Sequence, residues 1–121
     1  MTLMEFKEYC LSKAGTSPDF PFDQETLVLK VGTKMFALVN INGNPVSVNL
    51  KCDPLLAQDL RSRYEDVIPG YHMNKKHWNT VRIDGALGED LVREMIDLSY
   101  DLVFRGLTRK ERDEIQKTAG V

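Results

Sequence analysis

Apolar and polar residues alternate through the middle of the chain in a pattern typical of β-strands. Val46, Val48 and Leu50 occupy every second position of one segment, and polar residues separate them. Side chains two residues apart point to the same face of a strand, so one face of the predicted sheet is apolar and the other polar. Gly32-Thr33 favours a tight turn and Asn42-Gly43 a hairpin. The pattern predicts three consecutive strands, at about residues 25–31, 34–41 and 45–51.

Apolar residues recur at helical spacing elsewhere along the chain. Capping-box patterns, in which a threonine is followed three residues later by a glutamate, begin at Thr2 and Thr108. Asp53 is a typical N-cap before a first-turn proline, and Gly106 is suited to end the longest helix. We expect helices at about residues 2–13, 54–64 and 88–105, a final helix after Thr108, and a further strand at about 78–83.

Two segments are expected to lack regular structure. Residues 16–23, TSPDFPFD, are rich in proline and aspartate and favour an extended or turned linker, and Ile68-Pro69-Gly70 is expected to break the chain. The order of the remaining elements predicts an α+β domain, in which helices pack on the apolar face of an antiparallel sheet. The chain length suits a single domain covering residues 1–121.

Composition restricts the environment in which we expect the protein to work. No apolar run approaches the roughly 20 residues that a membrane helix needs, and the N-terminal sequence MTLMEFKEY lacks the layout of a signal peptide. Cys10 and Cys52 stand far apart, in no metal or redox motif, which favours two reduced thiols. We therefore expect a monomeric cytoplasmic protein without a membrane segment.

The net charge of −2 conceals an uneven distribution. Residues 26–52 and 67–83 together contain six basic residues and no acidic one, so the rest of the chain carries a net charge of −8. Charges farther apart than a Debye length of about 8 Å act almost independently at physiological salt. If helices cover one face of the sheet, we expect a basic surface on or beside the other face. The six basic residues are Lys30, Lys34, Lys51, Lys75, Lys76 and Arg82.

The segment YHMNKKHWNTVR, residues 71–82, holds both histidines and the only tryptophan of the chain. His72 and His77 would lie about 140° apart on a helix and on opposite faces of a strand, which disfavours a shared metal ion. The sequence contains no spacing typical of a nucleophile with its base and no phosphate-binding glycine loop. We therefore expect neither a metal, nor a cofactor, nor enzymatic activity. For Trp78 two interpretations stay open, a buried anchor or a partly exposed ring that stacks on a base.

Several blocks of the sequence resemble the MmcQ/YjbR-like family of small bacterial proteins. The resemblance is carried by PGYHMNKKHWNTV at 69–81, KMFAL at 34–38, SVNLKCDP at 47–54 and LVREMIDLSYDLV at 91–103, with FPFD at 20–23. It implies an α+β sandwich similar to bacterial frataxin (CyaY), described as a double-wing motif, and it implies DNA binding. Iron binding of the frataxin kind is not expected, because the stretch from residue 26 to residue 52 contains no acid.

Charge and resemblance together predict a protein that binds nucleic acid, with duplex DNA as the expected partner, weakly and with little sequence preference. Six phosphate contacts would give a log–log salt dependence of about −5. The alternative is a protein-interaction module, or a small-anion or nucleotide-binding module, that does not bind DNA. The residues expected to contact nucleic acid are Lys34, Lys51, His72, Asn74, Lys75, Lys76, His77, Trp78, Asn79 and Arg82, with Lys30 as a further phosphate contact.

Overall fold

The computed structural model describes residues 1–119, which form six strands and four helices. The strands make one antiparallel sheet in the order β1-β2-β3-β4-β6-β5. The strands are β1 (Thr16–Asp19), β2 (Thr26–Val31), β3 (Lys34–Asn40), β4 (Ser47–Lys51), β5 (Val67–Pro69) and β6 (Trp78–Arg82). The helices are α1 (Leu3–Leu11), α2 (Pro54–Arg63), α3 (Glu89–Arg105) and α4 (Arg109–Ala119).

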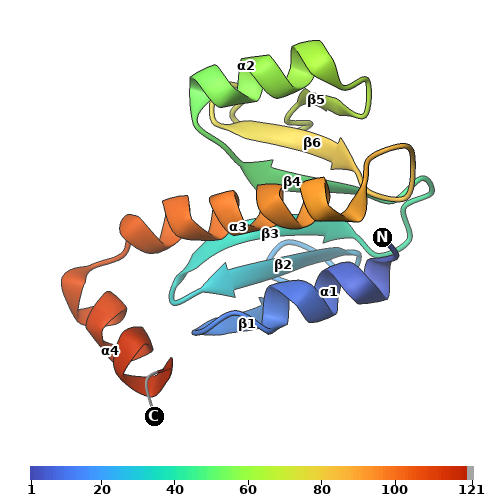
Figure 1. Ribbon diagram of the computed structural model, residues 1–121. Helices are drawn as coiled ribbons and strands as arrows, with labels where there is room; N and C mark the ends of the chain where they lie inside the picture. Colours follow the sequence, from blue (N-terminus) through green and yellow to red (C-terminus); the bar gives the residue numbers. More distant parts are fainter. Residues whose placement is uncertain (120–121) are drawn as a thin grey trace.

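Three helices cover one face of the sheet (Figure 1). Helix α1 packs on β1 and β2, α3 crosses β3 and β4, and α2 contacts β5. Helix α4 continues from α3 beyond the end of the sheet (Figure 1). The α+β architecture with helices on one face is therefore confirmed, and within residues 1–119 the other face of the sheet carries no helix.

The two edge strands differ from the expectation. Thr16–Asp19 and Val67–Pro69 pair as β1 and β5 at opposite edges of the sheet, although both were expected to be irregular. Each contains a proline, which has no backbone N–H to donate and is therefore tolerated on an edge strand, where one side of the backbone has no ladder partner. The local sequence indicates an extended segment, and pairing with β2 or β6 turns that segment into a strand.

The sheet has a main core on its helix-covered face and a small cluster on its open face. The main core contains the alternating apolar residues of the central strands, including Leu29 and Val48, and confirms the predicted apolar face. On the open face, Val28, Leu38 and Trp78 form a separate buried cluster. Strand alternation thus places Trp78 outside the main core.

Ser99 of α3 joins two strands at one end of the sheet. Its buried Oγ donates to the carbonyl of Phe36 at 2.6 Å and accepts from the amide of Lys51 at 2.8 Å. The β3–β4 ladder pairs Ala37 with Leu50 and does not continue to the next residues. The serine hydroxyl therefore takes the place of a missing ladder bond where the two strands separate.

Among residues 1–119, no helix is long and apolar enough to span a membrane.

Candidate nucleic-acid interface

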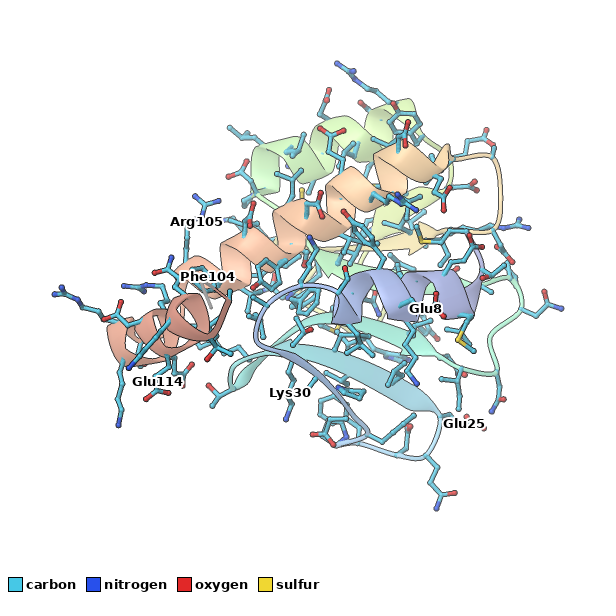
Figure 2. The ribbon with its side chains drawn as sticks, turned by 60° about the horizontal axis from the view of Figure 1, so that its bottom comes forward. Glu8, Glu25, Lys30, Phe104, Arg105 and Glu114 are labelled. Carbon is cyan, nitrogen blue, oxygen red and sulfur yellow. The ribbon has the colours of Figure 1, made fainter. Side chains whose placement is uncertain are left out.

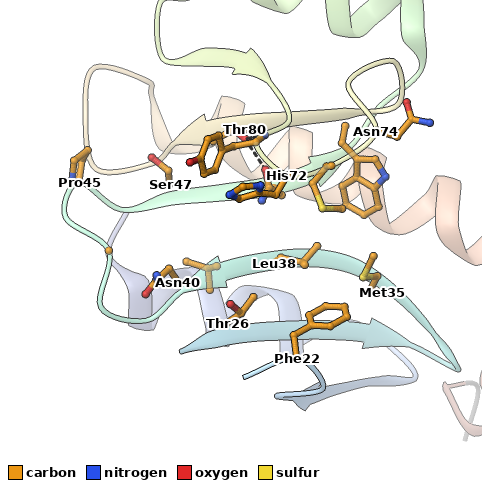
Figure 3. Close-up of a pocket in the computed structure, with 16 residues that line it drawn as sticks. Phe22, Thr26, Met35, Leu38, Asn40, Pro45, Ser47, His72, Asn74 and Thr80 are labelled. Atoms are coloured by element: carbon orange, nitrogen blue, oxygen red, sulfur yellow. Dashed lines mark hydrogen bonds between the residues drawn. The ribbon is translucent and has the colours of Figure 1, made fainter. Parts of the chain in front are cut away.

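A groove of about 750 Å³ occupies the open face of the sheet (Figure 3). Met35, Leu38 and Trp78 supply apolar side chains to it, and Asn49 and Thr80 supply polar ones. Figure 3 shows Phe22 on the side of β2, and His72 and Thr80 on the opposite side, formed by β6 and the loop before it. None of the 16 residues that line the groove in the described chain is an Asp, Glu, Lys or Arg. The groove is therefore amphipathic and uncharged along its walls.

The loop between β5 and β6, residues 70–77, is held by hydrogen bonds to its own backbone. The carbonyl of Asn74 accepts from the amides of His77 at 3.2 Å and Trp78 at 3.0 Å, and the Asn74 side chain accepts from the amide of Lys76 at 2.9 Å. His72 has a φ of +59°, a region in which histidine is among the more tolerated residues. The conformation turns the chain sharply enough to bring His72 and Asn74 to the groove.

Thr80 connects this loop to the sheet. Its Oγ1 accepts from the amide of Tyr71 at 2.8 Å and donates to Oδ1 of Asn49 at 2.5 Å. Asn49 and Thr80 are direct partners in the β4–β6 register, so both side chains rise from the same face. Neither was predicted as a site residue, although the alternation of the two strands placed both on the polar face.

Arg61 of α2 is a second residue that sequence reasoning missed. Its Nε donates to Oδ1 of Asn79 at 2.7 Å, and its Nη2 donates to the carbonyls of Lys75 and, at 3.2 Å, Trp78. Arg61 thus fixes the end of the loop to the helix layer. No local sequence signal identifies it, because its partners lie on another element.

Asn79 and Trp78 do not present the surface that a nucleic-acid contact requires. Asn79 is 2 % exposed and faces Arg61, so its expected direct contact is wrong for this structure. Trp78 is 8 % exposed, which supports the interpretation as a buried anchor beneath the groove. Both residues position the loop through packing and hydrogen bonds, whereas an exposed side chain is needed to reach a ligand.

Four lysines come from segments that meet near the start of β6, and we call this region the lysine end. Lys34 and Lys51 line a second hollow, which shares Met35 and Trp78 with the groove. Lys51 is the direct register partner of Trp78. Lys34 donates to the carbonyl of Gly106 at 2.8 Å, at the C-terminal end of α3. The lysine end consists of Lys34, Lys51, Lys75 and Lys76, and none of these four forms an ion pair within residues 1–119.

Two of the six expected cations are neutralised by neighbouring carboxylates. Lys30 projects from β2 on the side away from α1 (Figure 2). Its Nζ lies 2.9 Å from Oδ2 of Asp19 on β1. Nε of Arg82 lies 3.1 Å from Oδ1 of Asp84. Arg82 is at the far end of β6, roughly 13 Å along the strand from Trp78. The pKa of Asp19 is lowered, first because Lys30 donates a hydrogen bond to it. Two of the six expected phosphate contacts are therefore already paired with carboxylates, and the other four lysines form no ion pair within residues 1–119.

The two histidines have different surroundings. His72 lines the groove and its ring lies 4.0 Å from that of Tyr71, centroid to centroid. His77 does not line the groove in the described chain, and its carbonyl accepts from the amide of Cys52 at 2.8 Å. No group of three or more His, Cys, Asp or Glu side chains within residues 1–119 is arranged to hold a metal ion.

Comparisons with known proteins identify the family. The family model described as YjbR matches residues 11–102. The uncharacterised protein YjbR of Escherichia coli strain K12 is 36% identical over 112 residues, covering 93% of this chain and 95% of that protein. The uncharacterised protein YyaQ of Bacillus subtilis is 28% identical over 116 residues, covering 84% of this chain and 98% of that protein.

Solved structures extend the likeness to three dimensions. The crystal structure of Deinococcus radiodurans protein DR2400, described by a DUF419 domain, superposes with a TM-score of 0.89 at 40% identity, covering 95% of this chain and 88% of that one. A crystal structure of a Pseudomonas syringae protein superposes with a TM-score of 0.74 at 32% identity, covering 84% of this chain and 98% of that one. The chain belongs to the YjbR family.

Proposed function

We propose that the protein binds DNA through the open face of its sheet, weakly and with little sequence preference. The observation that carries this proposal is the lysine end, where four lysines without carboxylate partners in residues 1–119 adjoin an uncharged groove. Phosphate contacts by lysine supply most of the affinity of non-specific binding. The acidic helices lie on the other face, so their repulsion of a polyanion is screened across the thickness of the domain.

The four lysines set the expected strength of binding. Non-specific complexes of this kind have dissociation constants of about 10⁻⁴–10⁻⁶ M at physiological salt. Four phosphate contacts give a log–log salt dependence of about −3.6 on duplex DNA. This salt dependence is less steep than the slope of about −5 expected for six contacts. The difference arises because Lys30 and Arg82 are already paired with Asp19 and Asp84.

A fluorescence-anisotropy titration with labelled DNA tests the proposal. Titrations between about 50 and 200 mM salt measure the affinity and its salt dependence. The double variant Lys75→Ala/Lys76→Ala is expected to weaken binding and to reduce the salt slope by about one for each lysine. The matched control, Lys7→Ala/Lys117→Ala, removes two lysines from α1 and α4 and is expected to leave the slope unchanged.

Two results would contradict the proposal. One is the absence of saturable binding even at about 50 mM salt, where a four-contact site binds far more tightly than at physiological salt. The other is a salt slope that the Lys75→Ala/Lys76→Ala variant and the control variant change equally. Equal changes would mean that net charge alone, and not the lysine end, determines the interaction.

A further inference from the structure

We propose that the groove receives the unpaired bases of a single-stranded nucleic acid, while the lysine end contacts its phosphates. This inference rests on the proposed function and specifies the form of nucleic acid that the open face takes. It departs from duplex DNA, which the sequence alone had led us to expect. Two separate surfaces of the open face support it, a concave one without Asp, Glu, Lys or Arg and a basic one beside it.

The walls of the groove match a nucleobase in chemistry. A base is a planar, uncharged ring with hydrogen-bonding edges, and it needs apolar contact on its faces and polar groups at its rim. Leu38 and Met35 provide apolar contact, and the amide of Asn40 and the hydroxyl of Ser47 provide polar groups. The absence of any carboxylate among the 16 lining residues of the described chain removes the repulsion that would keep a phosphate-bearing ligand away.

Two large aromatic side chains stand exposed on opposite sides of the groove. Phe22 is 65 % exposed and precedes β2, whereas Tyr71 is 66 % exposed and follows β5. Exposed aromatic rings beside a concave surface mark interaction sites more often than isolated surface residues do. Stacking of one base on such a ring strengthens binding roughly 5- to 150-fold. Tyr71 is further ordered by its backbone bond to Thr80 and by contact with the His72 ring.

The lysines flank the groove at one end and do not line it. Lys34 and Lys51 line the adjoining hollow, which meets the groove at Met35 and Trp78. An unpaired strand presents its bases and its phosphates to different surfaces, and proteins that bind single strands combine an aromatic groove with a flanking basic track. The two hollows have this arrangement.

A duplex would use the same face poorly. Duplex DNA keeps its base faces stacked inside the helix, and proteins read it with an α-helix or a β-ribbon that enters a groove of the DNA. The helices α1, α2 and α3 pack on the opposite face of the sheet (Figure 1). A duplex could therefore reach the lysine end, but it would leave the groove and the Phe22 and Tyr71 rings without a partner.

The test compares two ligands and two variants. The ligands are a labelled strand of about twelve thymidines and a hairpin duplex of similar length, both titrated at about 50 mM salt. We expect the single strand to bind at least ~10-fold more tightly than the duplex. The double variant Phe22→Ala/Tyr71→Ala is expected to weaken single-strand binding at least ~10-fold, to weaken duplex binding less than ~2-fold, and to leave the salt slope unchanged. The control, Leu55→Ala, removes a side chain that is 79 % exposed on α2 and is expected to change neither affinity.

The possible failures are distinguishable. If the duplex binds as tightly as the single strand, or if the Phe22→Ala/Tyr71→Ala variant and Leu55→Ala weaken single-strand binding equally, this inference is wrong and the proposed function stands. If thymidine monophosphate competes as well as the strand at equal nucleotide concentration, the groove takes a single nucleotide and the inference is also wrong. If neither nucleic acid binds, both the inference and the proposed function are wrong.

Discussion

Arg61 on α2 donates from Nε to Oδ1 of Asn79 on β6 across 2.7 Å. The same guanidinium donates from Nη2 to the carbonyls of Lys75 and Trp78, so one side chain closes the loop against the helix layer. Asn79 is buried and its Nδ2 has no hydrogen-bond partner in the described chain, which makes its bond to Arg61 the only one that its side chain forms there. The conformation of the proposed interface therefore depends on a residue outside it.

Arg61→Met is expected to lower the free energy of unfolding by about 2–3 kcal/mol. The substitution keeps the apolar stem but removes the donors to Asn79 and to two carbonyls, and a hydrogen bond from a charged group is worth about 1.5–3 kcal/mol. The three contributions do not add in full, because Arg61 is only half-buried and water can replace part of what is lost. Chemical denaturation measures the change, and hydrogen exchange should show faster exchange of the His77 and Trp78 amides. The matched control is Arg63→Met, which breaks only an exposed pair with Asp59 and should cost less than about 0.5 kcal/mol. Equal losses for the two variants would exclude the anchoring role of Arg61.

Ser99→Ala is expected to cost about 2–3 kcal/mol of stability, although it removes a single oxygen. The hydroxyl bridges the carbonyl of Phe36 and the amide of Lys51, and both groups would lose a buried partner. Ser62→Ala is the control, because the Ser62 hydroxyl bonds its own helix at an exposed position. Thermal denaturation compares the two variants, and a Ser99→Ala protein as stable as Ser62→Ala would contradict the bridging role.

Gly15→Ala is expected to destabilise the junction between α1 and α4 by about 1–2 kcal/mol. Gly15 has a φ of +72°, a conformation that costs an L-residue about that amount. An added Cβ would also lie 2.7 Å from Cγ1 of Ile115, so the Ile115 side chain, or α4 with it, would have to shift. Gly88→Ala serves as the control, since no atom lies within 4 Å of a Cβ at that position. Denaturation midpoints measure both, and a smaller loss for Gly15→Ala than for Gly88→Ala would contradict this account.

The central strands were predictable because their alternation directly reflects burial. Val48 and Leu50 face the helices and Asn49 faces the groove, as the period of two requires. The edge strands were not predictable in the same way. Their short proline-containing segments become strands only through pairing with β2 and β6, which is a tertiary effect.

The candidate site was only partly predictable, because sequence shows the positions of charges and not their partners. The acid-free segments led us to count Lys30 and Arg82 as free cations. The fold pairs Lys30 with Asp19 from a neighbouring strand, and Arg82 with Asp84, which directly follows the acid-free segment. The loop that the sequence singled out does lie beside the groove, to which it contributes His72 and Asn74. The contribution of Phe22 was missed, because it reaches the groove from a segment that precedes β2 by only a few residues and shows no periodicity.

Both cysteines are expected to be inert towards thiol reagents in the folded protein. Cys10 and Cys52 are buried and free, and burial raises the pKa of Cys10 to about 12 and that of Cys52 above its ordinary value. The thiolate is the reactive form, so reaction at neutral pH should follow the opening of the structure. A chromogenic disulfide reagent measures the reaction. It should react slowly with the native protein, and in denaturant it should react rapidly with both thiols. Rapid modification of either cysteine under native conditions would contradict the buried placement.

Tyr9 is expected to make stability decrease at alkaline pH. Its hydroxyl donates to Oδ1 of Asp97 at 2.7 Å, and this bond, with burial and the aspartate charge, raises the pKa of Tyr9 from 10.0 to about 12. The folded state then holds the proton more tightly than the unfolded state. The contribution of the protonated Tyr9 hydroxyl to the free energy of unfolding is complete below pH 10. It decreases as pH rises from about 10 and is lost above about 12. Denaturation of wild type and Tyr9→Phe across this range measures it: wild type should be the more stable below pH 10, and the difference should vanish near pH 12. Tyr71→Phe, at an exposed tyrosine, controls for general alkaline effects. A difference between wild type and Tyr9→Phe that stays constant with pH would show that the bond to Asp97 does not hold the proton.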